Sequence, residues 1–158
     1  MSRTDFAWGA IADRTADSSV ILHAPHGCAW IPEAARGEFV IDDADLARET
    51  LVLTDHATDQ IADKVRQHAA VSAVVDRVSR FVMDPERFDG PDEEMNAVGM
   101  GVLYTHGTRR QLIREIPDAR RAEYMGWYRE YSDAFTSLVD AALRMHGRAV
   151  IIDVHSYP

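Results

Sequence analysis

The chain has 158 residues, of which 46% are hydrophobic and 27% are charged, and its formal net charge at pH 7 is −9. This length and balance predict one soluble domain over residues 1–158 with material for a hydrophobic core. The negative charge argues against general binding to nucleic acid or to an anionic membrane surface. No apolar run reaches the length of a membrane span, and the first residues lack the apolar core of a signal peptide.

A single cysteine, Cys28, excludes an internal disulfide and any metal site built from several cysteines. Disulfides are rare in reducing compartments, so this usage of cysteine fits the cytoplasm. We therefore expect a cytoplasmic protein.

The first half of the chain predicts a strand, a helix and a second extended segment. Val20-Ile21-Leu22 begins a short apolar strand. Residues 56–70 predict a helix with one apolar face, and Thr54 or Asp55 is the expected cap. Residues 72–83 predict extended structure, and the polar stretch after them contains too many turn-forming residues to be regular.

The second half predicts a long helix between two strands. Residues 101–104 are a candidate short strand, and residues 118–146 keep the three-or-four spacing of an amphipathic helix. Gly147 stands where a helix C-cap belongs. The apolar run Val150–Val154 predicts an interior strand. Alternating helices and strands predict an α/β fold with a mainly parallel or mixed sheet flanked by helices.

Three polar clusters lie beside these elements. The first, HAPHG at residues 23–27, follows a strand, and its glycine permits close approach of another backbone. The second, TDHATD at residues 54–59, places Asp55 and Asp59 one helical turn apart. The third is Asp153-Val154-His155, in which the carboxylate and the imidazole point to the same side of a strand.

Such clusters can form a metal site. Two histidines and a carboxylate from separate strand ends are the ligand set of a catalytic zinc site, which leaves a fourth position for water. Zinc lowers the pKa of that water to about 7 and polarises a carbonyl, as amide hydrolysis requires.

Each cluster also has a purely structural interpretation. His23 or His26 could satisfy backbone groups of its loop, and Asp55 could be a helix cap. Asp153 and His155 could pair with each other. The spacings alone do not decide between the two interpretations.

The order of these segments resembles the N-formylglutamate amidohydrolase (N-formylglutamate deformylase) family. PHGCAWIP is similar to its His-Ser-Gly loop followed by Ile-Pro, and TDHATD to its Thr-Asp element with a second Asp. GVLYTHG is similar to a short strand and glycine, and DVHS matches Asp-x-His-Ser. Arg120 or Arg121 with Tyr124 and Tyr128 is similar to a helix start that in the family carries a proline and a histidine, where this chain has Trp127 and Arg129.

SRFVMDPER, residues 79–87, is similar to the family's Ser-Arg-aromatic-Val-x-Asp-x-Asn-Arg segment. It keeps Ser79, Arg80, Asp84 and Arg87 in register, while Glu86 replaces the usual asparagine. The resemblance runs in collinear order over residues 20–157.

The resemblance implies a zinc hydrolase of phosphorylase/hydrolase-like fold, akin to zinc carboxypeptidases. It implies His26 and His155 as ligands of Zn²⁺ or another divalent metal, and a carboxylate completes the set. We favour Asp55, which precedes a helix and can face a cleft at the strand ends, and we keep Asp59 as the alternative.

The resemblance also implies a substrate and a pathway. The substrate is a small anionic N-acyl amino acid such as N-formyl-L-glutamate, which is cleaved to formate and the amino acid in histidine degradation. Arg80 and Arg87 are the candidates to hold its carboxylate, because a guanidinium binds carboxylate bidentately. Their structural alternative is an ion pair with Asp84 or Glu86.

Members of this family usually continue past Asp-x-His-Ser, and in the related carboxypeptidases the general base comes from that later region. We therefore expect the C-terminal part of the family domain to be absent here and leave the catalytic base unassigned beyond Pro158. An interior strand so near the end of the chain also predicts self-association, or a longer native polypeptide.

Two other functions remain open at this point. One is a cysteine hydrolase in which His26 or His155 activates Cys28. The other is a catalytically inactive homologue that binds a ligand, which Glu86 and the short C-terminus favour.

Overall fold

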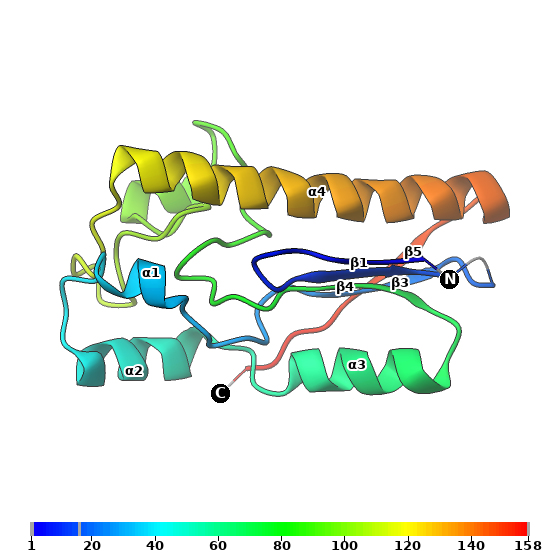
Figure 1. The fold of residues 1–158 in the computed structure, drawn as a ribbon, viewed down its shortest axis with the longest axis horizontal. Helices are drawn as coiled ribbons and strands as arrows, with labels where there is room; N and C mark the ends of the chain where they lie inside the picture. The colour runs from blue at the N-terminus through cyan, green and yellow to red at the C-terminus, as the bar shows by residue number, and fades with distance from the viewer. Residues whose placement is uncertain (1, 16, 158) are drawn as a thin grey trace.

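The computed structural model describes residues 2–15 and 17–157, and side chains from residue 6 onward. Within this part, five strands form one sheet in the order β1-β2-β4-β3-β5. Figure 1 shows this sheet between two layers of helices. The strands are β1 (Ser2–Asp5), β2 (Ile11–Arg14), β3 (Val20–Ala24), β4 (Ser72–Val75) and β5 (Val150–Asp153).

The sheet is mixed. β3 lies between β4 and β5 and is parallel to both. β2 pairs antiparallel with β4 and with β1. The α/β fold with a mixed sheet and flanking helices is therefore confirmed. Because β4, β3 and β5 run in the same direction, their carboxyl ends meet at one edge, where α/β proteins commonly bind ligands.

Two helices cover opposite faces of the sheet (Figure 1). α3 (Thr58–His68) packs on β3 and β4 from one side, and α4 (Asp118–His146) lies along the other. The remaining helices are α1 (Glu33–Arg36), α2 (Asp43–Leu53) and the 3₁₀ helix η1 (Glu94–Val98). No helix within the described residues is long and apolar enough to cross a membrane.

Alternation along the central strands divides the core into two layers. Ile21 and Val74 face α4 and join the larger cluster, which contains Tyr124, Tyr131 and Leu138. Leu22, Ala24, Ala73 and Val75 face α3 and pack on Ala62. Both faces of β3 and β4 are therefore covered, which explains why these strands are continuous apolar runs.

The two helix predictions are confirmed, but one cap is different. α4 spans the predicted residues 118–146, and Gly147 ends it with a left-handed φ of 69°. α3 lies inside the predicted range 56–70, yet its N-cap is Ala57, with a left-handed φ of 67° and no side-chain cap. Thr54 is instead the C-cap of α2, a helix that the periodicity did not reveal. The expected cap at Thr54 or Asp55 is therefore wrong.

Two predictions of extended structure need correction. The segment expected to be extended over residues 72–83 is a strand only as far as Val75, and residues 101–104 form bends and irregular structure instead of a strand. Phe81, Val82 and Tyr104 are nevertheless fully or almost fully buried. Their apolar character reflects burial in a core of packed loops, which apolar patterning alone does not distinguish from a strand.

β5 occupies a different place in the sheet from the predicted one. Val150–Val154 was expected in the interior, but β5 pairs with β3 on one side and is the edge of the sheet in the described part of the chain. Val150, Ile151 and Ile152 are 44–46% exposed. An apolar run does not distinguish an interior strand from an edge strand, because in either place β5 would pair with β3 on one side. Self-association stays a prediction.

A buried ion pair holds the loop that follows β4. Arg114 is fully buried, and its Nε and Nη2 donate to Oε2 of Glu38 at 2.9 and 2.6 Å. Its Nη1 donates to the carbonyl oxygens of Phe81 and Val82 at 2.5 and 3.0 Å. One guanidinium therefore satisfies backbone groups of the segment that leads directly into residues 84–87.

Replacing Arg114 by Ala should lower the free energy of unfolding by about 3–5 kcal/mol, because Glu38 loses a buried partner and two carbonyls lose their donor. Urea unfolding at pH 7 measures the change. The exposed Arg148→Ala variant is the control and should stay within about 0.5 kcal/mol of the parent. Equal effects of the two substitutions would contradict the structural role of Arg114.

Candidate active site at the strand ends

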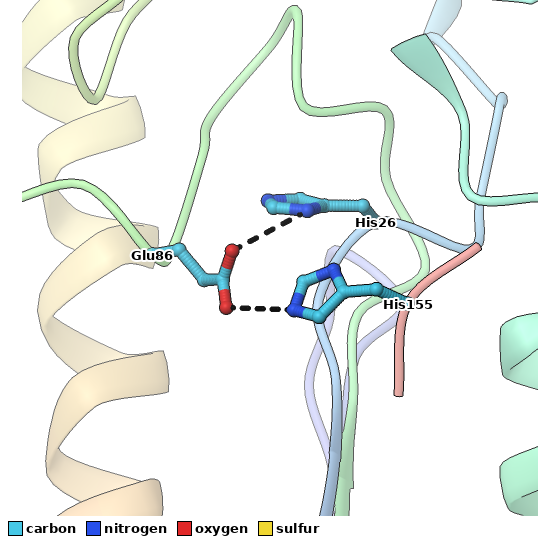
Figure 2. Close-up of side chains that lie close together, drawn as sticks. All are labelled: His26, Glu86 and His155. Atoms are coloured by element: carbon cyan, nitrogen blue, oxygen red, sulfur yellow. Dashed lines mark hydrogen bonds and ion pairs between the residues drawn. The ribbon is translucent and has the colours of Figure 1, made fainter. Parts of the chain in front are cut away.

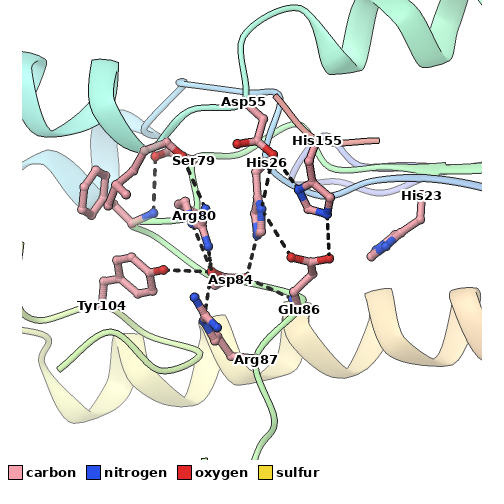
Figure 3. Close-up of polar contacts among 12 residues, drawn as sticks. His23, His26, Asp55, Ser79, Arg80, Asp84, Glu86, Arg87, Tyr104 and His155 are labelled. Atoms are coloured by element: carbon pink, nitrogen blue, oxygen red, sulfur yellow. Dashed lines mark hydrogen bonds and ion pairs between the residues drawn. The ribbon is translucent and has the colours of Figure 1, made fainter. Parts of the chain in front are cut away.

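The three sequence clusters and the residue 79–87 segment meet at the carboxyl edge of β4, β3 and β5. β3 leads into His26, β4 leads into the segment that carries Asp84 and Glu86, and β5 leads into His155. Figure 3 shows these side chains converging from separate segments of the chain. The parallel pairing of the three strands is what brings them together.

Gly27 allows the His26 loop to lie against the start of α3. A side chain at position 27 would place its Cβ 2.6 Å from the backbone nitrogen of Asp59, closer than real atoms approach. In the same region the backbone N–H of Asp55 donates to the carbonyl oxygen of His26 at 3.0 Å. The predicted close approach at this glycine is thus observed, and it fixes Asp55 beside His26.

Asp84 is the anchor of the cluster. It is fully buried and accepts hydrogen bonds from Nε2 of His26 at 2.8 Å and from the hydroxyl of Tyr104 at 3.0 Å. Arg80 donates to Oδ2, the oxygen that Tyr104 also binds, with Nε and Nη2 at 3.1 and 2.8 Å, whereas His26 is bound to Oδ1. Burial alone would raise the pKa of Asp84, but His26, Arg80 and Arg87 together hold it well below its usual range. Asp84 is therefore an anion.

His155 lies between two carboxylates. Its Nδ1 is 2.6 Å from Oδ2 of Asp55, and its Nε2 is 3.1 Å from Oε1 of Glu86. Partial burial lowers the pKa of His155, but the hydrogen bond to Asp55 and the charge of Glu86 outweigh it, so the pKa is raised above its ordinary value.

A third imidazole, His23, lies deeper. Its Nδ1 is 2.7 Å from Oδ1 of Asp153, and its ring stacks on Phe135 with 4.5 Å between the ring centroids. Burial lowers the pKa of His23 despite the opposing effect of Asp153. The sequence also allowed Asp153 and His155 to pair with each other. In the structure they do not pair, because Asp153 contacts His23 and His155 contacts Asp55.

The structure brings His26, Asp55 and His155 together, as the three sequence clusters suggested. Oδ2 of Asp55 is 3.9 Å from Nδ1 of His26 and 2.6 Å from Nδ1 of His155. Asp59 is engaged elsewhere, in an ion pair with Arg77 at 3.0 Å. Their roles as metal ligands stay predictions.

The two arginines are placed differently from each other. Arg80 is bound to Asp84 through two nitrogens and lies over the ring of Tyr104. It therefore forms the ion pair that was the structural alternative to substrate binding. Arg87 also forms an ion pair with Asp84, with its Nε 3.6 Å from the carboxylate, but its side chain is 27% exposed. Of the two, Arg87 has the more exposed side chain and the looser contact with Asp84.

Glu86 is the residue that sequence reasoning undervalued. It was noted as a replacement for asparagine, but its carboxylate lies between His26 and His155 (Figure 2). His23 belonged to the first sequence cluster but was not chosen as a metal ligand. The departure from the family segment at position 86 was the one available signal, because a charged residue next to two imidazoles changes what they can bind.

The donors in this cluster suit a divalent cation. Within the described residues, ligand atoms of His26, Glu86 and His155 lie within 4.8 Å of one another, and so do those of His23, Glu86 and Asp153. Nδ1 of His26 and Nε2 of His23 are buried and have no hydrogen-bond partner. Buried nitrogens without a partner beside carboxylates are an arrangement that a metal ion would complete.

Cys28 does not have the environment of a nucleophile. Its sulfur accepts a hydrogen bond from the backbone N–H of Trp30 at 3.4 Å, and burial raises the pKa of the thiol. A reactive cysteine needs a lowered pKa from a neighbouring positive group. The environment of the thiol therefore disfavours the cysteine hydrolase.

Comparison with known proteins agrees with the fold and the motifs. The sequence profile described as N-formylglutamate amidohydrolase matches residues 18–158, which places the chain among the amidohydrolases. The chain belongs to the N-formylglutamate amidohydrolase family, and the resemblance seen in its motifs is confirmed. Among curated proteins, none matches the sequence.

One similar solved structure is that of N-formylglutamate amidohydrolase from Ralstonia eutropha JMP134. It has a TM-score of 0.72 and 20% sequence identity, and the match covers 89% of this chain. The chain described here spans about half of that protein, since the match covers 54% of its length.

The pKa values of two histidines in the metal-free protein should lie on opposite sides of about 6.5, the ordinary histidine value. His155 should titrate above it because of Asp55 and Glu86, and His23 below it because of burial. The stabilisation from protonated His155 is complete below about pH 6.5 and is lost as the pH rises through the raised folded pKa. NMR titration of the imidazole protons, assigned with His155→Gln and His23→Gln, measures both. A reversed order would contradict this arrangement.

Proposed function

We propose that this chain carries the active centre of a metal-dependent amidohydrolase that cleaves the amide of an N-formyl or N-acyl amino acid. The observation that carries the proposal is the convergence of His26, His155 and neighbouring carboxylates at the carboxyl ends of three parallel strands. Membership of the N-formylglutamate amidohydrolase family supports the reaction and makes N-formyl-L-glutamate the first substrate to test.

The residues of the cluster have different proposed roles in binding the metal ion and in positioning its ligands. His26 and His155 with a carboxylate, predicted as Asp55, would hold Zn²⁺ or another divalent ion. When bound, such an ion makes water nucleophilic at neutral pH and polarises the amide carbonyl. Asp84 keeps the His26 ring fixed through Nε2 and leaves Nδ1 without a hydrogen-bond partner.

Arg87 is the proposed clamp for the substrate carboxylate. Its side chain is partly exposed, and its backbone carbonyl accepts a hydrogen bond from Tyr128 of α4 at 2.8 Å, which fixes this part of the loop. Arg80 was predicted for the same task and supports it indirectly by neutralising Asp84. A cytoplasmic location and a place in histidine degradation belong to the same proposal and are supported by the composition and the family. Self-association is proposed as well, and the exposed apolar residues Val150, Ile151 and Ile152 of β5 support it.

Purified protein loaded with Zn²⁺ should release formate from N-formyl-L-glutamate, and removal of the metal by a chelator should abolish this activity. Formate release is measured with a coupled assay, and metal content by elemental analysis. Cys28→Ser should keep the activity within about threefold, because the thiol has a raised pKa and no role in the site. Loss of activity in Cys28→Ser alone would favour the cysteine hydrolase. Metal binding without hydrolysis of any N-acyl amino acid would favour the inactive homologue.

Arg87→Ala should raise KM for N-formyl-L-glutamate by about 10-fold to 100-fold, the usual effect of losing a charged hydrogen bond to a carboxylate. Steady-state kinetics on N-formyl-L-glutamate and on N-formyl-L-glutamine, which lacks the side-chain carboxylate, show which carboxylate Arg87 holds. Arg87→Lys is the matched variant, since it keeps the charge and removes the planar pair of donors. Unchanged kinetics in Arg87→Ala would remove Arg87 from the substrate site.

A further inference from the structure

We propose that Glu86 is the carboxylate ligand of the metal ion, together with His26 and His155, and that Asp55 and Asp84 are the residues that position the two imidazoles. This inference rests on the proposed metal centre and replaces Asp55 as the expected carboxylate ligand. Figure 2 shows the three side chains facing one another.

The two imidazoles are arranged in the same way. Nε2 of His26 is 2.8 Å from Asp84, and its Nδ1 faces Oε2 of Glu86 at 3.5 Å. Nδ1 of His155 is 2.6 Å from Asp55, and its Nε2 faces Oε1 of Glu86 at 3.1 Å. Metal-bound histidines usually donate their other ring N–H to a carboxylate, which fixes the tautomer and the ring orientation. In both rings the nitrogen left for a metal is the one that faces Glu86.

The distances from Glu86 and from Asp55 to the two imidazoles indicate which of these carboxylates is the ligand. Two atoms bound to one tetrahedral ion at about 2.0–2.1 Å lie about 3.4 Å apart. The contacts of Glu86 with the two imidazoles, at 3.5 and 3.1 Å, lie on either side of that separation. The contacts of Asp55 lie further from that separation, at 2.6 Å to His155 and 3.9 Å to His26. Glu86 therefore fits the ligand position better than Asp55 does.

Burial gives an independent reason. The His26 side chain is 2% exposed, and its Nδ1 has no hydrogen-bond partner. An unpaired buried polar atom has a substantial energetic cost, so it indicates a binding partner or a functional role. The Glu86 side chain, by contrast, is 29% exposed. A cation between Glu86 and His26 would satisfy this buried nitrogen.

Asp84 also fixes the backbone of the proposed ligand. Oδ1 of Asp84 accepts a hydrogen bond from Nε2 of His26 and a second one from the backbone N–H of Glu86, at 3.0 Å. The orientation of one ligand ring and the position of the other ligand's backbone therefore depend on the same oxygen. Pro85, between Asp84 and Glu86, restricts the chain further. Such a fixed arrangement suits a ligand more than a freely moving surface glutamate.

Zinc affinity of isosteric variants tests the assignment. Glu86→Gln and Asp55→Asn each change one carboxylate to an amide of the same shape. Glu86→Gln should weaken zinc binding by more than about 100-fold, because an amide is a poor ligand for zinc. Asp55→Asn should weaken it by about 10-fold, since the amide oxygen still accepts a hydrogen bond from Nδ1 of His155. Affinity is measured by competition with a chromophoric chelator, and the visible spectrum of the Co²⁺ form reports the ligand set.

Asp59→Asn is the matched control, since Asp59 pairs with Arg77 outside the cluster, and it should leave zinc affinity unchanged. Thermal unfolding of each metal-free variant checks that the fold is intact. Loss of zinc binding in Asp55→Asn with unchanged binding in Glu86→Gln would overturn the proposal and establish Asp55 as the ligand. If the parent protein binds neither zinc nor cobalt, the proposed metal centre itself fails. If it binds zinc tightly without cleaving N-acyl amino acids, the ligand assignment stands and only the activity fails.

Discussion

The arrangement of the site depends on one buried anion, the carboxylate of Asp84. It has no exposed surface, and it accepts hydrogen bonds from an imidazole, a guanidinium, a phenol and a backbone N–H. A buried charge without such partners would carry a desolvation cost of several kcal/mol, so the carboxylate and its donors must occur together. It also makes its surroundings unfavourable for further negative charge: burial and Asp84 raise the pKa of Tyr104 to about 12. His26, Arg80 and Tyr104 are therefore held in fixed positions by the electrostatics of a single group.

This anion connects the two halves of the site. The loop after β3 supplies His26, and the loop after β4 supplies Asp84 and Glu86, so the Asp84–His26 hydrogen bond joins two segments that are 58 residues apart. Arg114 holds the same loop from its other side, through the carbonyl oxygens of Phe81 and Val82. The loop has no regular secondary structure after Val75, and buried polar contacts take the place of a strand ladder. This explains why so apolar a segment is a loop and yet is fixed well enough to carry functional groups.

The sequence predicted the parts of the structure that local chemistry determines. The spacing over residues 118–146 and the glycine at 147 defined α4 to the residue, and the clusters at His26, Asp55 and His155 do meet. Tertiary context determined the rest. Thr54 is of a residue type that commonly caps a helix N-terminus, but in the structure it is the C-cap of α2. The N-cap of α3 is instead Ala57, which has a left-handed φ. The edge position of β5 and the pairing of His23 with Asp153 depend on strand order, which no local pattern encodes.

The charge of the site determines what kind of ligand it can accept. Asp55, Asp84, Glu86 and Asp153 surround three imidazoles, and Arg80 is already paired with Asp84. In a chain with a net charge of −9, an anionic substrate would meet an unfavourable field unless a local positive charge offset it. Arg87 is one such charge, and a divalent cation bound by the imidazoles would be the larger one. A carboxylate at position 86 strengthens this requirement, because it adds negative charge where the related family segment has a neutral asparagine. Metal binding and recognition of an anionic N-acyl amino acid would therefore be coupled in the proposed site: the acidic cluster that attracts a cation would repel the substrate in the absence of that cation.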